Sequence, residues 1–317
     1  MKNQKKNRLL ALALMVLFAM FAFTACGKDT TTTDTSAATT NTSRAKEIVI
    51  ATKNTPEQNI LANLAKILIT EKTGQEGKIV YFNDSTSSSL LERLNNGSID
   101  IFFDYSGSLA VNAFQLDIGA TNVPTLLLDV QNTAKKKYGI TVSEEIGYTS
   151  TTAFYMMNDR KEKLGISTIS SLAKKASKLK VGMTEGFYNR IDCYEAICKE
   201  YEMTFKQAKT YDEEDGFMAL ADGTIDVFID DSVTPYYSLF SKSQQLVDDK
   251  YFFLPQNACY LITDKTLEKY PELEDTLKQM EGLLTASKLS LMIKRIYWEG
   301  NDINDYLYTY LRANNII

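Results

Sequence analysis

The chain has 317 residues, of which 44% are hydrophobic, and this length is sufficient for two domains of ordinary size. It contains no histidine, so catalytic triads and metal sites that depend on histidine are excluded. The formal charge of -5 argues against nucleic acid or anionic lipid as a partner. No GxxxxGK[ST] or GxGxxG loop and no nucleophile–base pair occur, so we expect no enzyme, no cofactor and no metal site.

The N-terminal segment has the features of a secretory signal. Four basic residues precede an apolar run over residues 9–23, which is short for a membrane span, and small residues precede Cys26. Residues 23–26 resemble a bacterial lipobox, which implies cleavage after residue 25 and lipid on the thiol of Cys26; an ordinary signal peptide with an incidental cysteine is the alternative. We predict a signal peptide over residues 1–25 and a flexible tether, rich in threonine and serine, over residues 26–45.

Strands and helices are expected to alternate after the tether. In the first half we expect strands at residues 47–52 and 79–82, and helices at residues 56–73, 90–94 and 124–138. Residues 146–157 are expected to cross into the second half, which has helices near 170–178 and 192–201 and a strand at 179–183. A strand at residues 258–263 and three helices, at 267–284, 287–298 and 302–313, complete the chain.

Two stretches repeat each other in register. Residues 96–105 read NGSIDIFFDY and residues 222–231 read DGTIDVFIDD, and each follows a short leucine-bearing run. Each pattern predicts a helix, a glycine that ends it and a buried strand. Ligands of open α/β sheets bind beyond the carboxyl ends of the strands. We therefore predict that Tyr105 and Asp231, the last residues of the two stretches, face one ligand across a cleft between similar lobes; two unrelated helix–strand units are the alternative.

Strands that alternate with helices predict an α/β fold with parallel sheets. Two crossings between the halves, near Thr152 and Gln256, predict a discontinuous first lobe. We expect this lobe to comprise residues 46–151 plus 257–317, and the second lobe to comprise residues 152–256. A hinge with two crossings lets the lobes close on a ligand.

Several polar and aromatic residues are expected to have structural roles. Asp100 and Asp226 lie inside apolar strands and are expected to bond turn amides rather than to form an acid–base pair. The three cysteines after Cys26 are expected to be small buried residues first and a disulfide pair second, because an odd number cannot be fully paired. Four aromatic residues of the last helices are expected in the core: Tyr297, Trp298, Tyr306 and Tyr310.

Four short motifs, in one order along the chain, resemble those of a known family. Residues 51–58 resemble G-S-K-x-F-T-E-Q, and residues 97–108 resemble G-x-I-D-x-Y-x-E-Y-T-G-T. Residues 187–192 resemble E-F-x-x-R-x-D-G, and residues 248–255 resemble D-D-K-x-F-F-P-P-Y. The chain from about residue 47 onward thereby resembles the solute-binding proteins of ABC importers for glycine betaine, carnitine, choline and related osmoprotectants.

This resemblance implies a two-lobed periplasmic-binding-protein fold of type II with two hinge crossings. It also implies an extracytoplasmic protein held at the cell membrane by a lipid anchor, with a small-molecule solute and the permease and ATPase subunits of an ABC importer as partners. We expect the protein to be a monomer.

The resemblance implies a ligand site as well. The family holds a quaternary ammonium in a cage of tyrosines, which attract it by cation–π interaction, and holds the ligand's carboxylate with arginine, lysine and hydroxyl groups. On the carboxylate side the matching residues are Lys53, Ser108 and Arg190. One cage position is kept as Tyr105, and the other three fall on Thr152, Asp231 and Gln256.

The loss of three rings affects the choice of ligand. Each cation–π contact contributes roughly 0.5–2 kcal/mol, so the loss weakens binding of a trimethylammonium by orders of magnitude. A trimethylammonium also has no N–H bond to offer Asp231, so we expect a small zwitterion or cation that carries N–H donors. One alternative is a betaine, choline or carnitine binder with a rebuilt cage; others are a sensory lipoprotein and an enzyme on this scaffold. The rebuilt cage would use tyrosines from this set: Tyr148, Tyr155, Tyr188 and Tyr236.

Overall fold

The computed structural model describes residues 47–83, 85–118, 123–190, 193–238, 240 and 242–317. The predicted signal peptide, the tether and the predicted lipidation site, Cys26, lie outside the described residues. Asp192, the expected first residue of a helix in the second half, also lies outside them. Within these ranges no helix is both long enough and apolar enough to cross a membrane.

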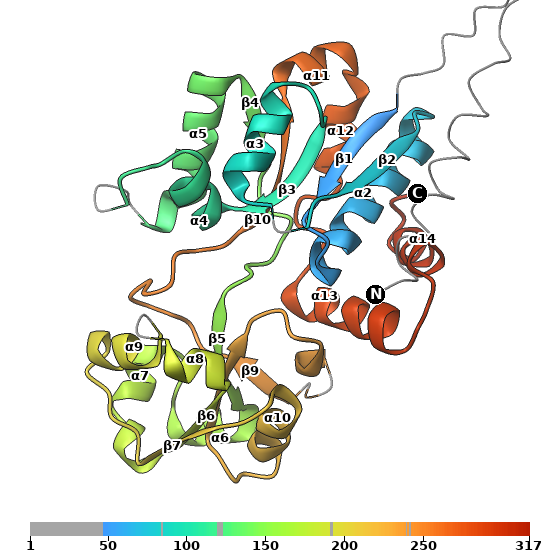
Figure 1. Ribbon diagram of the computed structural model, residues 1–317. Coiled ribbons are helices and arrows are strands. Elements are labelled where there is room, and N and C mark those ends of the chain that lie inside the picture. Colours follow the sequence, from blue (N-terminus) through green and yellow to red (C-terminus); the bar gives the residue numbers. More distant parts are fainter. Residues whose placement is uncertain (1–46, 84, 119–122, 191–192, 239, 241) are drawn as a thin grey trace, which may run out of the picture. The chain divides into compact units, whose positions relative to one another are not determined.

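The first sheet is built from two separated parts of the chain (Figure 1). Across the sheet its strands are β2 (Gly77–Tyr81), β1 (Ile48–Thr52), β3 (Ile101–Tyr105), β10 (Ala258–Thr263) and β4 (Ile140–Val142). β1 runs parallel to β2 and β3, whereas β10 is antiparallel to both β3 and β4. The long antiparallel strand therefore comes from the C-terminal part of the chain.

The second sheet has the same pattern. Across the sheet its strands are β7 (Gln207–Thr210), β6 (Lys180–Met183), β8 (Val227–Asp231), β5 (Thr152–Met157) and β9 (Ser243–Gln245). β6 runs parallel to β7 and β8, and β5 is antiparallel to β8 and β9. The chain passes between the two sheets twice, after β4 and after β9, as the sequence predicts.

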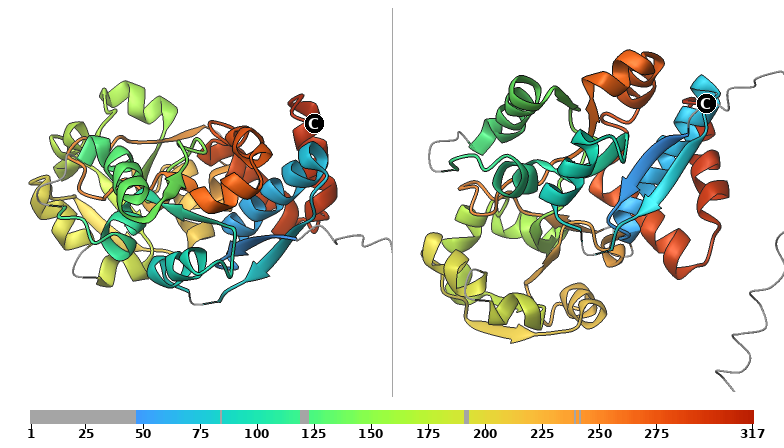
Figure 2. Two further views of the ribbon diagram at one scale, coloured as in Figure 1. Left: turned by 90° about the horizontal axis from the view of Figure 1, so that it is seen from above. Right: turned by 45° about the horizontal axis from the view of Figure 1, so that its top comes forward.

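Helices cover both faces of each sheet (Figures 1 and 2). In the first, α2 (Pro56–Thr73) packs on the face that carries Ile50 and Phe103, whereas α3 (Ser87–Asn95) and α5 (Leu126–Tyr138) pack on the face that carries Phe102. In the second, α10 (Glu213–Ala221) packs on the face of Phe228, and α7 (Ile169–Ala173) and α9 (Tyr194–Glu200) pack on the face of Ile229.

The other helical segments are α4 (Ser106–Ser108), α6 (Asn158–Leu164), α8 (Glu185–Asn189), α11 (Asp264–Lys269), α12 (Glu272–Lys278), α13 (Ala286–Ile293), α14 (Ile303–Ala313), η1 (Leu109–Ala113), η2 (Val123–Thr125), η3 (Ala176–Lys178), η4 (Pro235–Ser238) and η5 (Lys294–Trp298). The C-terminal segments contact the loop after β8. The hydroxyl of Ser290 in α13 donates to the carbonyl of Thr234, and the ring of Trp298 meets that of Tyr236 edge-on at 4.6 Å.

The repeated stretches have the same structure in both sheets. The glycine of each copy adopts a left-handed φ, +75° in the first and +80° in the second. The carboxylate of Asp100 accepts a 2.9 Å hydrogen bond from the N–H of Val49 at the start of β1. The carboxylate of Asp226 accepts a 2.9 Å bond from the N–H of Lys180 at the start of β6. Both aspartates have structural roles, as predicted, but they bond N–H groups of neighbouring strands rather than turn amides. The two lobes therefore repeat each other down to single hydrogen bonds.

Some expectations about the elements are wrong. The helix expected over residues 267–284 is broken into α11 and α12, because Pro271 disfavours a helical conformation at the residue before it. Tyr297 and Trp298 are 41% and 45% exposed rather than buried. Tyr306 and Tyr310 do pack against the core, as expected. The three cysteines that the structure describes form no disulfide with one another, and two of them are buried.

Candidate functional site

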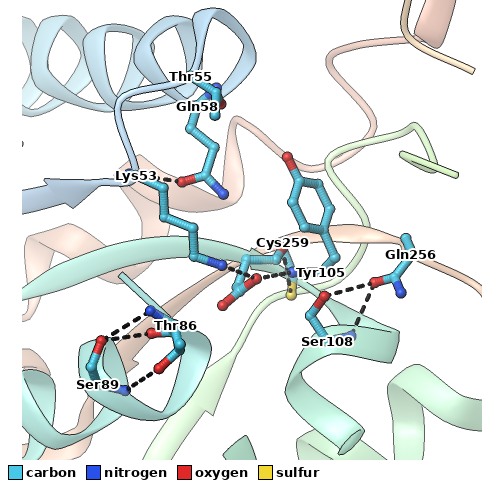
Figure 3. Close-up of polar contacts among 10 residues, drawn as sticks. Lys53, Thr55, Gln58, Thr86, Ser89, Tyr105, Ser108, Gln256 and Cys259 are labelled. Atoms are coloured by element: carbon cyan, nitrogen blue, oxygen red, sulfur yellow. Dashed lines mark hydrogen bonds and ion pairs between the residues drawn. The ribbon is translucent and has the colours of Figure 1, made fainter. Parts of the chain in front are cut away.

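Lys53, the first residue after β1, reaches a buried carboxylate (Figure 3). Its Nζ lies 2.8 Å from Oδ1 of Asp104, whose side chain has no exposed surface, while the Lys53 side chain is 20% exposed. The same oxygen accepts a 3.0 Å hydrogen bond from the N–H of Tyr105. The N–H of Lys53 donates to the amide oxygen of Gln58 at 3.1 Å, which holds the backbone in place. The ammonium group is therefore fixed at the ends of β1 and β3, with its charge compensated and one side open to solvent.

Two predicted site residues, Ser108 and Gln256, bond to each other (Figure 3). Oε1 of Gln256 accepts from the N–H of Ser108 at 3.0 Å and from its hydroxyl at 3.2 Å. Gly107 makes this approach possible, because a Cβ there would lie 2.6 Å from Nε2 of Gln256 and 3.0 Å from the carbonyl oxygen of Pro255. The second crossing of the chain is thus attached to the carboxyl end of β3.

Tyr105 lies beside Glu57, a carboxylate in the first turn of α2 that was not predicted as a site residue. Burial raises the pKa of Glu57, and the negative charge of Asp231 adds to the rise. The hydroxyls of Tyr105, Tyr148 and Ser150 lower the pKa in part, and that of Ser150 donates to Glu57 at 3.2 Å. Among the described residues, Oε1 of Glu57 and the hydroxyl of Tyr148 have no well-formed hydrogen bond. A partly desolvated carboxylate therefore lies near two phenol groups and near Asp231.

β8 ends in two acids that face opposite sides of the second sheet. Asp231 is the cross-strand partner of Thr152, and Asp230 is that of Ala153. Asp231 is exposed, although partial desolvation raises the pKa of its carboxyl. Asp230 is 8% exposed, and burial, followed by the charge of Glu213, raises its pKa to about 8. Oδ2 of Asp230 has no hydrogen-bond partner among the described residues.

The remaining predicted residues lie on the second lobe or at its edge. Arg190 is the residue at which α8 ends, and it is exposed. Its contact with a ligand carboxylate stays a prediction. Thr152 begins β5 and lines, with Pro255 and Asn257, a pocket of about 600 Å³ beside the two crossings.

The tyrosines of the alternative cage have different surroundings. Tyr148 lies near Glu57, as described above. The ring of Tyr155 meets that of Phe217 at 5.0 Å in the second core, and its hydroxyl donates to the carbonyl of Asp231 at 2.7 Å. The ring of Tyr188 lies 5.5 Å from that of Tyr194.

Sequence reasoning missed four polar residues of this region: Glu57, Gln58, Asp104 and Asp230. A signal for two of them was present, since Asp104 and Asp230 occupy the same place in the two repeated stretches. The other two follow Lys53 in the first motif of the family resemblance.

Comparisons with known proteins agree on one family. Residues 46–313 match the family model of the substrate-binding domain of ABC-type glycine betaine transport systems. The carnitine transport binding protein OpuCC of Listeria monocytogenes is 28% identical over 251 residues, which cover 76% of this chain and 78% of that protein. The ergothioneine transport permease/ergothioneine binding protein EgtU of Helicobacter pylori is 25% identical over 243 residues, which cover 75% of this chain and 42% of that protein.

Solved structures agree on the fold. A glycine betaine/carnitine/choline ABC transporter protein has a TM-score of 0.74 and 25% identity, covering 85% of this chain and 99% of its own. Apo YehZ of Escherichia coli has a TM-score of 0.73 and 18% identity, covering 86% of this chain and all of its own. The predicted α/β fold with two lobes, that of the periplasmic binding proteins, is confirmed, although each sheet is mixed rather than parallel.

Proposed function

Because the chain belongs to the family of substrate-binding domains of ABC-type glycine betaine transport systems, we propose that it captures a small zwitterionic or cationic solute whose charged nitrogen carries N–H bonds. The family consists of extracytoplasmic solute-binding proteins of importers, not of enzymes. The solute is held between the lobes, residues 46–151 plus 257–317 and residues 152–256. The residues that contact it are Lys53, Tyr105, Ser108, Thr152, Arg190, Asp231 and Gln256.

The observation that carries this proposal is the acid at the end of β8. Asp231 occupies a position where the family resemblance implies a ring of the cage, and it acts electrostatically on Glu57. Carboxylates accept hydrogen bonds from an ammonium group that carries N–H, and such charge-assisted bonds are about twice as strong as neutral ones. A trimethylammonium has no N–H and gains only the charge attraction. Methylation of the nitrogen is therefore expected to weaken binding.

A methylation series tests this expectation directly. The four compounds share one skeleton and lose one N–H bond at each step: glycine, sarcosine, N,N-dimethylglycine and glycine betaine. Calorimetric titration with this series therefore measures how the N–H bonds of the nitrogen affect the affinity. We expect affinity to fall along the series, with glycine betaine weakest. Choline, L-carnitine and ergothioneine complete the panel, because the names of related proteins mention solutes of this kind. Binding of glycine betaine that is micromolar or tighter, and that is lost in Tyr148→Ala, would favour a rebuilt cage instead.

We also propose that the mature chain begins at Cys26, carries lipid on its thiol and works as a monomer with a permease and an ATPase. Cys26→Ser is expected to move the protein from the membrane fraction to the soluble fraction of cells. Uptake of a bound solute that disappears when the partner permease is deleted indicates import. Unchanged uptake, with a transcriptional response to the solute, indicates a sensory role.

A further inference from the structure

The two lobes repeat one polar arrangement and differ at one residue of it. The matching hydrogen bonds at the starts of β1 and β6, described above, set the correspondence between the strands. Along β3 and β8 this correspondence pairs Asp104 with Asp230. Lys53 is the first residue after β1 and Thr184 is the first residue after β6, so these two residues occupy equivalent positions in the two lobes. The first lobe therefore has a lysine where the second lobe has a threonine.

This difference leaves the two aspartates with unequal partners. Asp104 accepts from the N–H of the next residue and from the ammonium of Lys53. Asp230 also bonds the N–H of the next residue, but its second partner is the neutral hydroxyl of Thr234 rather than an ammonium group. Within the part of the chain that the structure describes, Oδ2 has no partner in either aspartate, so the two differ in the charge of their partners. Tyr155, whose ring lies on the same face of the sheet, already donates its hydroxyl to a backbone carbonyl.

The groups around Asp230 are acidic or neutral. Its side chain lies on the face of the second sheet that α10 covers, because its cross-strand partner Ala153 belongs to the core on that face. Among the described residues, the groups that act most strongly on its pKa carry negative charge or none. The titratable and polar groups that face it are Glu213 from α10, Asp231 from β8, Thr234 from the following loop, Tyr155 from β5 and Tyr236 from η4.

We propose that Asp230 holds the N–H-bearing cation of the solute, as Asp104 holds the ammonium group of Lys53 in the first lobe. This inference rests on the proposed function and adds to Asp231, the neighbouring acid at the end of β8, a second residue that selects the ligand's nitrogen. The solute's nitrogen lies at the carboxyl ends of β6 and β8, and its N–H bonds are donated to Oδ2 of Asp230. The phenol groups of Tyr155 and Tyr236 are close enough to Asp230 to interact with it electrostatically.

Binding of the cation requires the ionised carboxylate. The raised pKa of Asp230, about 8, means that the carboxyl of the unliganded protein holds a proton at neutral pH. A solute that enters as an ammonium ion therefore displaces this proton, which leaves to solvent, so one proton is released for each cation bound. The affinity is expected to rise up to about tenfold per pH unit as pH increases toward the pKa, and to level off above it.

Calorimetry of the unmodified protein measures the proton release. Sarcosine and ethanolamine are titrated at neutral pH in two buffers of different ionisation enthalpy, and the difference in heat gives the number of protons released. We expect a value near one. Asp230→Asn removes the charge with little change of shape and is expected to bind roughly 10- to 100-fold more weakly, the range for a lost hydrogen bond to a charged group, without proton release. Asp215→Asn, an exposed acid in the first turn of α10, is the matched control and binds normally.

A second pair of variants adds the missing lysine. Thr184→Lys places an ammonium group where the first lobe has Lys53, and it is expected to pair with Asp230 and to abolish binding of sarcosine and ethanolamine. Thr184 also caps α8, accepting from the N–H of Phe187. Thr184→Ala removes this cap without adding charge, and its affinity is expected to stay within about threefold of the wild type, because the cap does not touch the solute. Circular dichroism shows whether each variant is folded.

The outcomes separate the two proposals. If the wild type binds neither sarcosine nor ethanolamine nor any solute of the panel, both the proposed solute class and the role of Asp230 are overturned. If it binds one of them and the folded Asp230→Asn and Thr184→Lys variants bind it equally well, only the role of Asp230 is overturned. The role of Asp230 is supported if Asp230→Asn and Thr184→Lys both lose binding. The affinities of Asp215→Asn and Thr184→Ala must then stay near that of the wild type.

Discussion

Asp230→Asn is expected to stabilise the unliganded protein, and the gain should depend on pH. The ordinary pKa of an aspartate is 3.8, and burial raises that of Asp230 to about 8. Between these values the folded chain holds a proton that the unfolded chain has lost. The free energy of unfolding therefore falls as pH rises through this window. Asparagine carries no titratable proton, so the free energy of unfolding of the variant does not fall in this way as pH rises.

The size of the effect follows from the two pKa values. At pH 7 the folded carboxyl is still protonated, and about three pH units separate this pH from the ordinary pKa of 3.8. At about 1.4 kcal/mol per unit, the loss in the wild type is about 4 kcal/mol at pH 7 and about 1–2 kcal/mol at pH 5. The variant should thus be more stable by up to these amounts, and its melting temperature at pH 7 should be higher by several degrees.

Thermal and urea denaturation at pH 4, 5, 7 and 8.5 measure the difference between the wild type and Asp230→Asn. Asp215→Asn is again the control, since its carboxylate is exposed and its substitution should leave stability unchanged at each pH. A difference that is absent at pH 4 and grows toward pH 8 supports the reasoning. Equal stability of Asp230→Asn and the wild type at all four values would show that the carboxyl is not held protonated, and would refute it.

Three further predictions concern other contacts of the site. Gly107→Ala is expected to displace the amide of Gln256 and to weaken solute binding roughly tenfold, the loss of about one hydrogen bond, as measured by calorimetry. Lys53→Met leaves the buried Asp104 without its cation and is expected to destabilise the protein by about 3–5 kcal/mol in urea denaturation. Tyr155→Phe leaves a carbonyl of β8 without its donor and is expected to cost about 1–3 kcal/mol in the same assay.

Each of these predictions has a control or a contrary outcome. Gly186→Ala is the control for Gly107→Ala. The added Cβ would have no neighbouring atom within 4 Å, so this variant should bind the solute as the wild type does. If Lys53→Met combined with Asp104→Asn is as unstable as Lys53→Met alone, the uncompensated charge is not the cause. If Tyr155→Phe unfolds at the same urea concentration as the wild type, its hydroxyl bond contributes nothing to stability.

The elements that carry a strong local pattern could be predicted from the sequence. The helix α2 begins and ends where it was expected, because its apolar face, its cap Thr55 and the left-handed Gly74 after it are all local features of the sequence. The repeated stretches likewise fixed β3 and β8 with the helices before them. The edge strands β4, β7 and β9 have three or four residues each, too few for any periodicity, and they form only because a neighbouring strand is present.

In the site, too, the features that depend on local sequence could be predicted, and those that depend on contacts between distant segments could not. The type and place of Lys53 could be predicted, but its partner Asp104 lies 51 residues away, and only the pairing of β1 with β3 brings them together. The surroundings of Glu57 come from three separate segments, so its raised pKa had no local signal. Ser108 and Gln256 were both predicted as ligand contacts, whereas their bond to each other depends on the small size of Gly107.

The edge-on contact between Trp298 and Tyr236 gives the protein a built-in optical probe. Trp298 is the single tryptophan of the chain, so light that excites indole selectively reads one place only. Its neighbour Tyr236 belongs to the short helix that follows Asp230 by a few residues, and α13 holds that loop through Ser290. A solute that rearranges the loop should therefore change the wavelength or intensity of Trp298 fluorescence, and no attached dye is needed to detect its binding.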